Sequence, residues 1–150
     1  MLVVKQIEWD MGHRVMNHAS KCRNMHGHRY KVEIALEGNL IAKAGDSSEG
    51  MVIDFSEVKR IAMEYVHDVL DHGFMIWEKD EVLMKFFDEN KEFKKIVVPF
   101  TSTAENMAKW IFEQLDDKFK DIYKTGLRLK WVRLWETPTG YVIYKNNEHK

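Results

Sequence analysis

The chain has 150 residues, of which 45% are hydrophobic and 31% are charged, so its length and composition predict one folded domain over residues 1–150. The formal charge is −1, which excludes the strongly basic composition of a typical nucleic-acid-binding protein and leaves only a local basic patch open. No apolar run is long enough to span a membrane, and Met1–Gln6 lacks the features of a signal peptide. We therefore expect a cytoplasmic protein with no nucleic-acid or membrane partner.

Two segments near the N-terminus alternate apolar and polar residues. Leu2–Trp9 and Tyr30–Glu37 each place their apolar side chains on one side, which predicts two half-buried strands. The segment between Ala44 and Gly50 is rich in turn residues and is expected to be a loop.

The period changes after this loop. From Asp54 to Leu70 apolar residues recur every three or four positions, which predicts an amphipathic helix with Asp54 as its N-cap and Gly73 just past its end. Glu81–Phe87 is expected to form a shorter helix, and Ile96–Val98 a short extended segment.

The last part of the chain combines one helix with two strands. Ser102 and Glu105 have the spacing of a capping box, which predicts that Ser102 caps a helix burying apolar residues between 107 and 115. Leu127–Trp131 and Tyr141–Tyr144 alternate around a turn. The predicted fold class is α+β: an antiparallel four-stranded sheet, with helices inserted between strands two and three and packed on one face.

A histidine cluster suggests metal chemistry. His26 and His28 are two residues apart on a strand, so both imidazoles can face one ion, and His13 can join them if the first two strands pair. Three histidines leave one position open on Zn²⁺, as in catalytic zinc sites. Two alternatives remain: the histidines are ordinary surface or hydrogen-bonded residues, or Cys22 closes the shell as a fourth ligand of a structural site.

Asp71, His72 and Glu136 are further candidates. At the end of the predicted helix, Asp71 can orient the imidazole of His72, and the helix dipole favours its charged form. The simpler interpretations are a water-exposed helix cap for the pair and a solvated strand-end charge for Glu136.

Six motifs in order are similar to those of the 6-pyruvoyltetrahydropterin synthase and 6-carboxytetrahydropterin synthase family. They are Trp9–His13, Cys22 with His26–His28, Gly50–Phe55, Leu70–His72, Ser102–Asn106 and Trp135–Thr137. The resemblance covers nearly the whole chain. It implies a tunnelling fold (T-fold) and a homo-hexamer, built as a dimer of trimers, with active sites between subunits.

The resemblance also implies a role for each candidate residue. It makes His13, His26 and His28 the zinc ligands and Cys22 the catalytic base. It makes Asp71 and His72 a second catalytic pair supplied by a neighbouring subunit. The pterin ring would be bound by Glu136, in a pocket lined by Thr103 and Glu105.

The implied substrate is 7,8-dihydroneopterin triphosphate. The three residues between Cys22 and His26 resemble the bacterial carboxy enzymes, which release acetaldehyde and triphosphate and supply 7-deazaguanine synthesis for queuosine. The alternatives are the pyruvoyl enzyme of tetrahydrobiopterin synthesis, which only eliminates triphosphate, and a non-catalytic pterin-binding module. The basic residues that flank the motifs are candidates for binding the triphosphate: Arg14, Lys21, Arg23 and Arg29.

Overall fold

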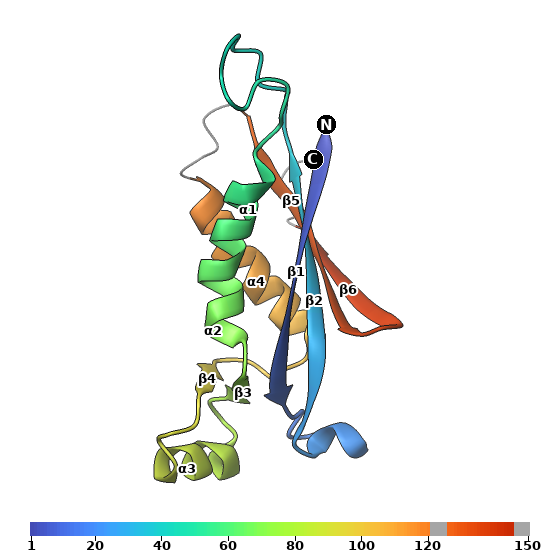
Figure 1. The fold of residues 1–150 in the computed structure, drawn as a ribbon. Helices are drawn as coiled ribbons and strands as arrows, with labels where there is room; N and C mark the ends of the chain where they lie inside the picture. The colour runs from blue at the N-terminus through green and yellow to red at the C-terminus, as the bar shows by residue number, and fades with distance from the viewer. Residues whose placement is uncertain (121–125, 146–150) are drawn as a thin grey trace.

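A six-stranded sheet organises the computed structural model, which describes residues 1–120 and 126–145. The strand order is β4-β3-β1-β2-β5-β6, and β1 and β2 are its long central strands (Figure 1). The strands are β1 Leu2–His13, β2 His26–Glu37, β3 Gly73–Trp77, β4 Lys95–Val98, β5 Arg128–Thr137 and β6 Gly140–Lys145.

The predicted α+β class is confirmed, but the predicted sheet was too small. The four expected strands are present as antiparallel pairs of β1 with β2, β2 with β5 and β5 with β6. Two short strands extend the sheet in parallel, with β3 on β1 and β4 on β3. Met75 and Ile76, adjacent in β3, are both buried, so this short strand lacks the regular alternation from which a half-buried strand is predicted.

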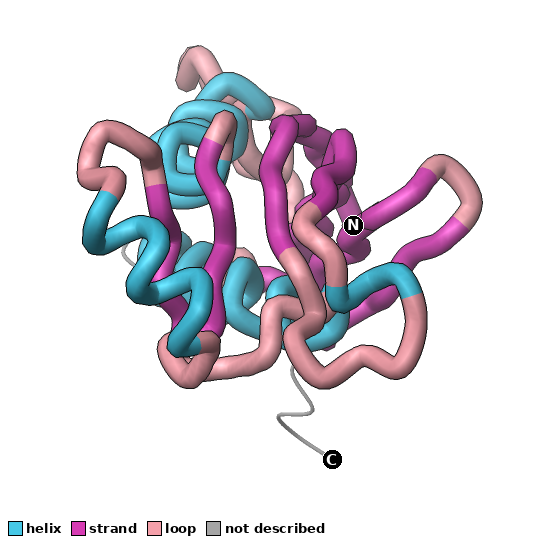
Figure 2. Tube along the Cα trace, turned by 90° about the horizontal axis from the view of Figure 1, so that it is seen from below, coloured by secondary structure: helices cyan, strands magenta, loops and turns pink. Residues whose placement is uncertain are grey.

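The predicted helices are all present, and all lie between β2 and β5. The long one runs through α1 Phe55–Ala62, a π-helical turn at Met63–His67 and α2 Asp68–Leu70. The others are α3 Glu81–Glu89 and α4 Ala104–Phe119. A 3₁₀ turn at Lys21–Arg23, which was not predicted, lies between β1 and β2. Helices α1, α2 and α4 cover one face of the sheet, whereas α3 lies beside β3 and β4 at the edge (Figures 1 and 2).

One of the two predicted N-cap residues is confirmed and the other is not. Asp54 caps α1 as predicted, because its carboxylate accepts the amide of Ser56 at 2.7 Å. The prediction that Ser102 caps the next helix in a capping box was wrong. Thr103 is the N-cap of α4, and the fully buried Ser102 instead donates its hydroxyl to the carbonyl oxygen of Arg14 at 2.8 Å. The helix therefore begins one residue later, since Ser102 ties the chain to the end of β1.

The sheet has one buried face and one charged face. Toward the helices, β1, β2 and β5 bury Trp9, Tyr30, Ile34, Val132 and Leu134 in one core with apolar side chains of α1 and α4. On the opposite face, Arg29 pairs with Glu8 and Asp10, and Arg133 with Glu33. Because side chains alternate along a strand, this division decides on which face each candidate site residue lies.

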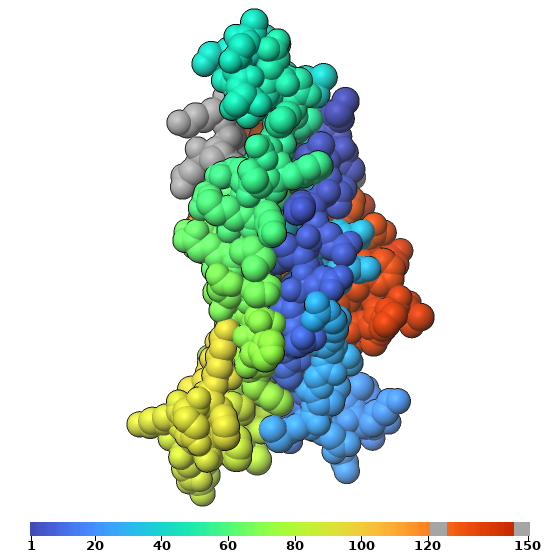
Figure 3. Space-filling model, in the orientation of Figure 1, coloured from blue at the N-terminus to red at the C-terminus, as the bar shows by residue number. Residues whose placement is uncertain are grey.

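At one end of the molecule, the segment containing α3 and the connection between β1 and β2 project side by side below the sheet (Figure 3). Arg14, at the start of that connection, forms two hydrogen bonds of 2.6 Å with Asp80, the N-cap of α3. The Asp80 carboxylate is buried and also accepts the amide of Leu83. This bidentate pair joins the two projecting segments.

Candidate functional site

The antiparallel pairing of β1 with β2 brings three histidines together. His13 lies opposite His26, and Met11 lies opposite His28, so all three imidazoles lie on the buried face. Their ring centroids are 4.6 to 5.2 Å apart. One nitrogen of each ring lies within 4.8 Å of the others, and within residues 1–120 and 126–145 this is the one His, Cys, Asp or Glu group with that geometry.

Hydrogen bonds from outside the cluster orient two of the rings. His13 Nδ1 lies 2.7 Å from the carbonyl oxygen of Ser102, and His26 Nδ1 lies 2.7 Å from that of Asn24. A carbonyl oxygen only accepts, so each Nδ1 carries the proton and each Nε2 keeps a free lone pair. This is how metal-binding histidines are commonly oriented.

The Nε2 atoms of two of the histidines have the properties expected of metal ligands. Nε2 of His13 and Nε2 of His28 are buried and have no hydrogen-bond partner. Buried polar atoms are seldom left unpaired, because each loses its bonds to water without replacement. A divalent ion held by three imidazole nitrogens would satisfy them, so the residues present fit a bound transition metal.

Burial also keeps His13 and His28 neutral. It lowers the pKa of His13 from 6.5 to about 4, against the raising effect of the hydrogen bond to Ser102. It lowers the pKa of His28 as well, although the Glu136 carboxylate opposes the shift. Both imidazoles are therefore unprotonated at neutral pH, the form that binds metal.

Glu136 faces the histidine cluster from β5. Its two carboxylate oxygens lie 3.9 Å from Nε2 of His13 and 3.9 Å from Nε2 of His28, which is longer than a hydrogen bond. Glu136 follows Val132 and Leu134 at a spacing of two, so the strand period places it on this face. The side chain is about one-third exposed, so the carboxylate borders both the histidines and solvent.

Tyr30 is a site residue that the sequence analysis missed. It is fully buried, its hydroxyl has no hydrogen-bond partner, and its ring meets those of His13 and His28 edge-on. Burial, and then the Glu136 charge, raise the pKa of its hydroxyl, so the hydroxyl stays protonated. Its position two residues after His28 was the available signal, because that spacing places it on the same face.

Cys22 lies in the 3₁₀ turn between β1 and β2. Its thiol is free and partly exposed, and its carbonyl accepts the amide of Val15 at 2.8 Å, which closes the connection. The Cys22 sulfur is not in the group of ligating atoms within 4.8 Å of one another. This arrangement gives no support to Cys22 as a fourth metal ligand.

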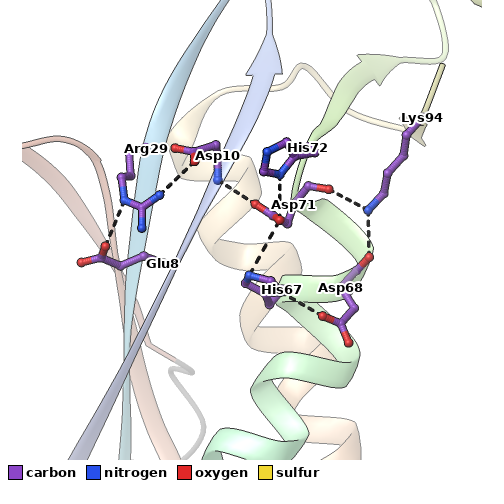
Figure 4. Close-up of polar contacts among 8 residues, drawn as sticks. All are labelled: Glu8, Asp10, Arg29, His67, Asp68, Asp71, His72 and Lys94. Atoms are coloured by element: carbon purple, nitrogen blue, oxygen red, sulfur yellow. Dashed lines mark hydrogen bonds and ion pairs between the residues drawn. The ribbon is translucent and has the colours of Figure 1, made fainter.

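Asp71 and His72 form a hydrogen-bonded dyad directly after α2 (Figure 4). Asp71 accepts the amide of Asp10 at 3.0 Å with one carboxylate oxygen and lies 2.8 Å from Nδ1 of His72 with the other. The hydrogen bond to Asp10 is the main cause of the lowered pKa of Asp71. The dyad is thus an ionised carboxylate that orients an exposed imidazole.

His72 also adopts an uncommon backbone conformation. Its φ is +57°, in the left-handed region that favours glycine. The sequence analysis placed a helix-terminating glycine at Gly73, but Gly73 opens β3 and His72 makes the left-handed turn. Non-glycine residues in this region cluster at functional sites.

The dyad and the histidine cluster make no direct polar contact among the described residues of one chain. His72 lines an open depression of about 470 Å³ over the cross-strand pair Gly12 and Gly27. Asp10 and Arg29 border this depression, and His28 of the cluster also contributes to its lining. Gly12 and Gly27 alternate with His13 and the other cluster residues, so their face of the sheet is the charged one. Among the described residues, no hydrogen bond or ion pair joins the dyad to the cluster.

The remaining predicted site residues lie near the start of α4. Thr103 caps the helix, and its hydroxyl accepts the amide of Asn106 at 3.4 Å. Glu105 is exposed in the first turn. Ser102, next to Thr103, connects this segment to the histidine cluster, because its carbonyl orients His13. The sequence offers no signal for this contact.

Two of the four basic residues considered for triphosphate binding have other partners. Arg14 is bound to Asp80, and Arg29 to Glu8 and Asp10. The other two, Lys21 and Arg23, are exposed on either side of Cys22.

No helix in the described part of the chain is both long and apolar enough to cross a membrane.

Comparison with known proteins agrees with these features. A family model described as 6-pyruvoyl tetrahydropterin synthase matches residues 2–147. The chain is 34% identical over 145 residues to the 6-carboxy-5,6,7,8-tetrahydropterin synthase of Haemophilus influenzae, covering 95% of this chain and 97% of that one. It is 31% identical to the synthase of the same name from Rickettsia conorii, covering 92% and 95%. It is 33% identical to the 6-pyruvoyl tetrahydrobiopterin synthase of Dictyostelium discoideum, covering 83% and 73%.

Solved structures share the fold. An uncharacterized protein from Wolinella succinogenes superimposes with a TM-score of 0.81 at 23% identity, covering 98% of both chains. The 6-pyruvoyl tetrahydropterin synthase of Caenorhabditis elegans gives 0.69 at 25% identity, covering 98% of this chain and 96% of that one. The expected tunnelling fold is thereby confirmed.

The buried histidines predict how the stability of the metal-free protein depends on pH. The folded state keeps His13 and His28 neutral, whereas the unfolded chain binds protons at the ordinary histidine pKa of 6.5. Between about pH 7 and pH 5 the unfolded state therefore binds more protons, so stability falls as pH falls. Urea unfolding of chelator-treated protein at pH 5, 6 and 7 measures this slope. His13→Gln should reduce the slope, and a wild-type slope of zero would contradict the assignment of neutral, buried imidazoles.

Proposed function

Because the chain belongs to the 6-pyruvoyl tetrahydropterin synthase family, we propose that it is a 6-carboxy-5,6,7,8-tetrahydropterin synthase. In the proposed reaction, 7,8-dihydroneopterin triphosphate and water give 6-carboxy-5,6,7,8-tetrahydropterin, acetaldehyde and triphosphate, a step toward 7-deazaguanine and queuosine. The observation that carries the proposal is the histidine cluster with its two buried, unpartnered Nε2 atoms. Relatives at 30 to 34% identity that are named 6-carboxy-5,6,7,8-tetrahydropterin synthase favour the carboxy product, and the 33% identical Dictyostelium relative is the one that carries the pyruvoyl name among those compared above.

In this proposal the metal is zinc, held by His13, His26 and His28. Imidazole nitrogens suit Zn²⁺, and three protein ligands leave a position open to substrate. When bound, zinc would supply Lewis acidity that makes the side-chain hydroxyls and the neighbouring C–H bond of the substrate more acidic. Ser102 and Asn24 would keep the rings of His13 and His26 oriented through their Nδ1 protons.

Proton transfer is assigned to Cys22 and to the dyad. Cys22, as the thiolate, would take a proton from the side-chain carbon of the substrate, and its free, partly exposed thiol is compatible with this role. His72, oriented by the Asp71 carboxylate, would return or relay protons as triphosphate leaves.

Recognition of the pterin is assigned to Glu136. A pterin ring presents a ring N–H and an exocyclic amine side by side, and a carboxylate can accept both in two parallel hydrogen bonds. The Glu136 carboxylate faces the histidine cluster and reaches solvent, so a ring bound there would hold its side chain near the metal ligands. Thr103 and Glu105, at the start of α4, would line the same pocket.

We further propose a cytoplasmic homo-hexamer, a dimer of trimers, in which each chain is one domain and active sites lie between subunits. The lack of any hydrogen bond or ion pair between the dyad and the histidine cluster among the described residues supports this assembly, in which a neighbouring subunit would supply the dyad. The edge strand β6 exposes Tyr141 and Ile143, which offers apolar surface for a neighbouring subunit.

The reaction products test the proposed function directly. Incubation of the zinc-loaded protein with 7,8-dihydroneopterin triphosphate should release acetaldehyde and triphosphate in equal amounts, measured with alcohol dehydrogenase and by phosphate chromatography. Triphosphate without acetaldehyde would assign the pyruvoyl reaction of the Dictyostelium relative instead. Absence of both products would leave a pterin-binding module.

The zinc ligands are tested by His26→Ala. Removal of one of three imidazoles should abolish stoichiometric zinc and activity together, because two nitrogens bind the ion far more weakly. Metal content by plasma emission spectroscopy and the acetaldehyde assay give the two readouts. His18→Ala is the matched control, since His18 is an exposed histidine outside the cluster and should keep both. Full zinc content in His26→Ala would refute the ligand assignment.

The role of Cys22 is tested by Cys22→Ala. This variant should keep its zinc and bind dihydroneopterin triphosphate with similar affinity, while kcat falls by about 10² to 10⁴, the usual contribution of a positioned acid–base group. Zinc analysis, calorimetric titration and steady-state kinetics separate these effects. A fully active Cys22→Ala enzyme would show that another group is the base, and loss of zinc would make Cys22 a ligand.

A further inference from the structure

Lys94 contacts the dyad from a segment that contains none of the proposed site residues. It lies directly before β4, and its side-chain ammonium donates hydrogen bonds of 2.8 Å to the carbonyl oxygens of Asp68 and Asp71 (Figure 4). Its own carbonyl accepts the amide of Phe74 in β3 at 3.0 Å. Lys94 is therefore held at its backbone and at the tip of its side chain.

The two acceptors are carbonyls at the C-terminal end of the long helix. Such carbonyls lack partners within the helix, and a cation at this end is favoured by the helix dipole. The neighbouring Lys95 behaves differently, because its ammonium pairs with the carboxylate of Asp88 in an ordinary exposed ion pair. Lys94 is thus directed at backbone, and its position depends on the shape of the turn after α2.

That turn determines the orientation of His72. The peptide group between Asp71 and His72 is bound on both sides: its carbonyl accepts from Lys94, and its N–H donates to the carbonyl of Asp10 at 2.8 Å. Fixing the plane of this peptide group restricts φ of His72, the angle that lies in the unfavourable left-handed region. Without one of the two bonds, the peptide is free to rotate toward commoner conformations.

The same turn carries the Asp71 carboxylate. This carboxylate holds both the amide of Asp10 and Nδ1 of His72, and His67 Nε2 lies 3.9 Å from it. Lys94 on one side and β1 on the other therefore hold the dyad between them. The imidazole itself is about four-fifths exposed, so packing contributes little to its orientation.

We propose that Lys94 is a positioning residue for His72, acting through the Asp71–His72 peptide and touching neither substrate nor metal. The proposal rests on the proposed function, in which His72 relays protons. A displacement of a proton-transfer group by 1 Å can lower the reaction rate about 10²-fold. The segment from β3 to β4 would therefore help to position His72, besides extending the sheet.

The test compares Lys94→Met, Lys94→Arg and Lys95→Met in the zinc-loaded enzyme. Methionine keeps the apolar stem but removes the donors, arginine restores a cation with several donors, and Lys95→Met removes the neighbouring ammonium. In Lys94→Met, hydrogen exchange of residues 70–74, followed by mass spectrometry, should become about tenfold faster through local opening. kcat should fall about tenfold at unchanged KM and zinc content, as expected for a group that acts in the transition state.

Lys94→Arg should recover most of both effects, and Lys95→Met should match the wild type in both. Unchanged exchange in Lys94→Met would overturn the proposal, since Lys94 would then not hold the turn. Faster exchange at unchanged kcat would also overturn it, because the turn would not matter for turnover. The exchange readout does not depend on the reaction, so a wild-type protein inactive on dihydroneopterin triphosphate would refute the proposed function separately.

Discussion

The register of β1 against β2 is the constraint on which the site depends. His13 opposite His26 and Met11 opposite His28 bring imidazoles from two strands to one face at one end of the sheet. A slip of one residue would turn His26 and His28 to the charged face and separate the cluster. The register is maintained by the alternation that buries Trp9 and Tyr30, so the contacts that stabilise the core also assemble the metal ligands.

The two faces of the sheet give the two halves of the site different electrostatic environments. The histidine cluster continues the buried face, where poor solvation keeps imidazoles neutral and able to coordinate. The dyad lies at the strand edge beside Asp10 and Arg29, where a carboxylate stays ionised and an imidazole stays in water. Metal binding needs neutral imidazoles, whereas a proton relay needs an ionised carboxylate beside an imidazole that can exchange protons. A site shared between subunits, as we propose, lets one chain provide both without a compromise in either.

Much of this arrangement could be predicted from periodicity. Spacings of two placed His26 and His28 on one face, and the helix ending at Leu70 placed Asp71 and His72 at its end. What periodicity missed depends on contacts distant in sequence or made by backbone atoms. The Ser102 carbonyl that orients His13 lies 89 positions away, and any residue could supply it. β3 escaped prediction because it is buried without regular alternation, and the capping box failed because Ser102 bonds Arg14.

The left-handed turn at His72 has a consequence for how this protein can change over evolutionary time. A non-glycine residue held in this region costs of order 1 to 3 kcal/mol, which glycine would not incur. Selection for thermal stability alone would thus favour glycine at position 72, whereas the proposed proton relay needs an imidazole there. Stability and activity oppose each other at this one position. Stabilising substitutions in the surrounding segment could therefore compensate for strain that the turn itself cannot lose.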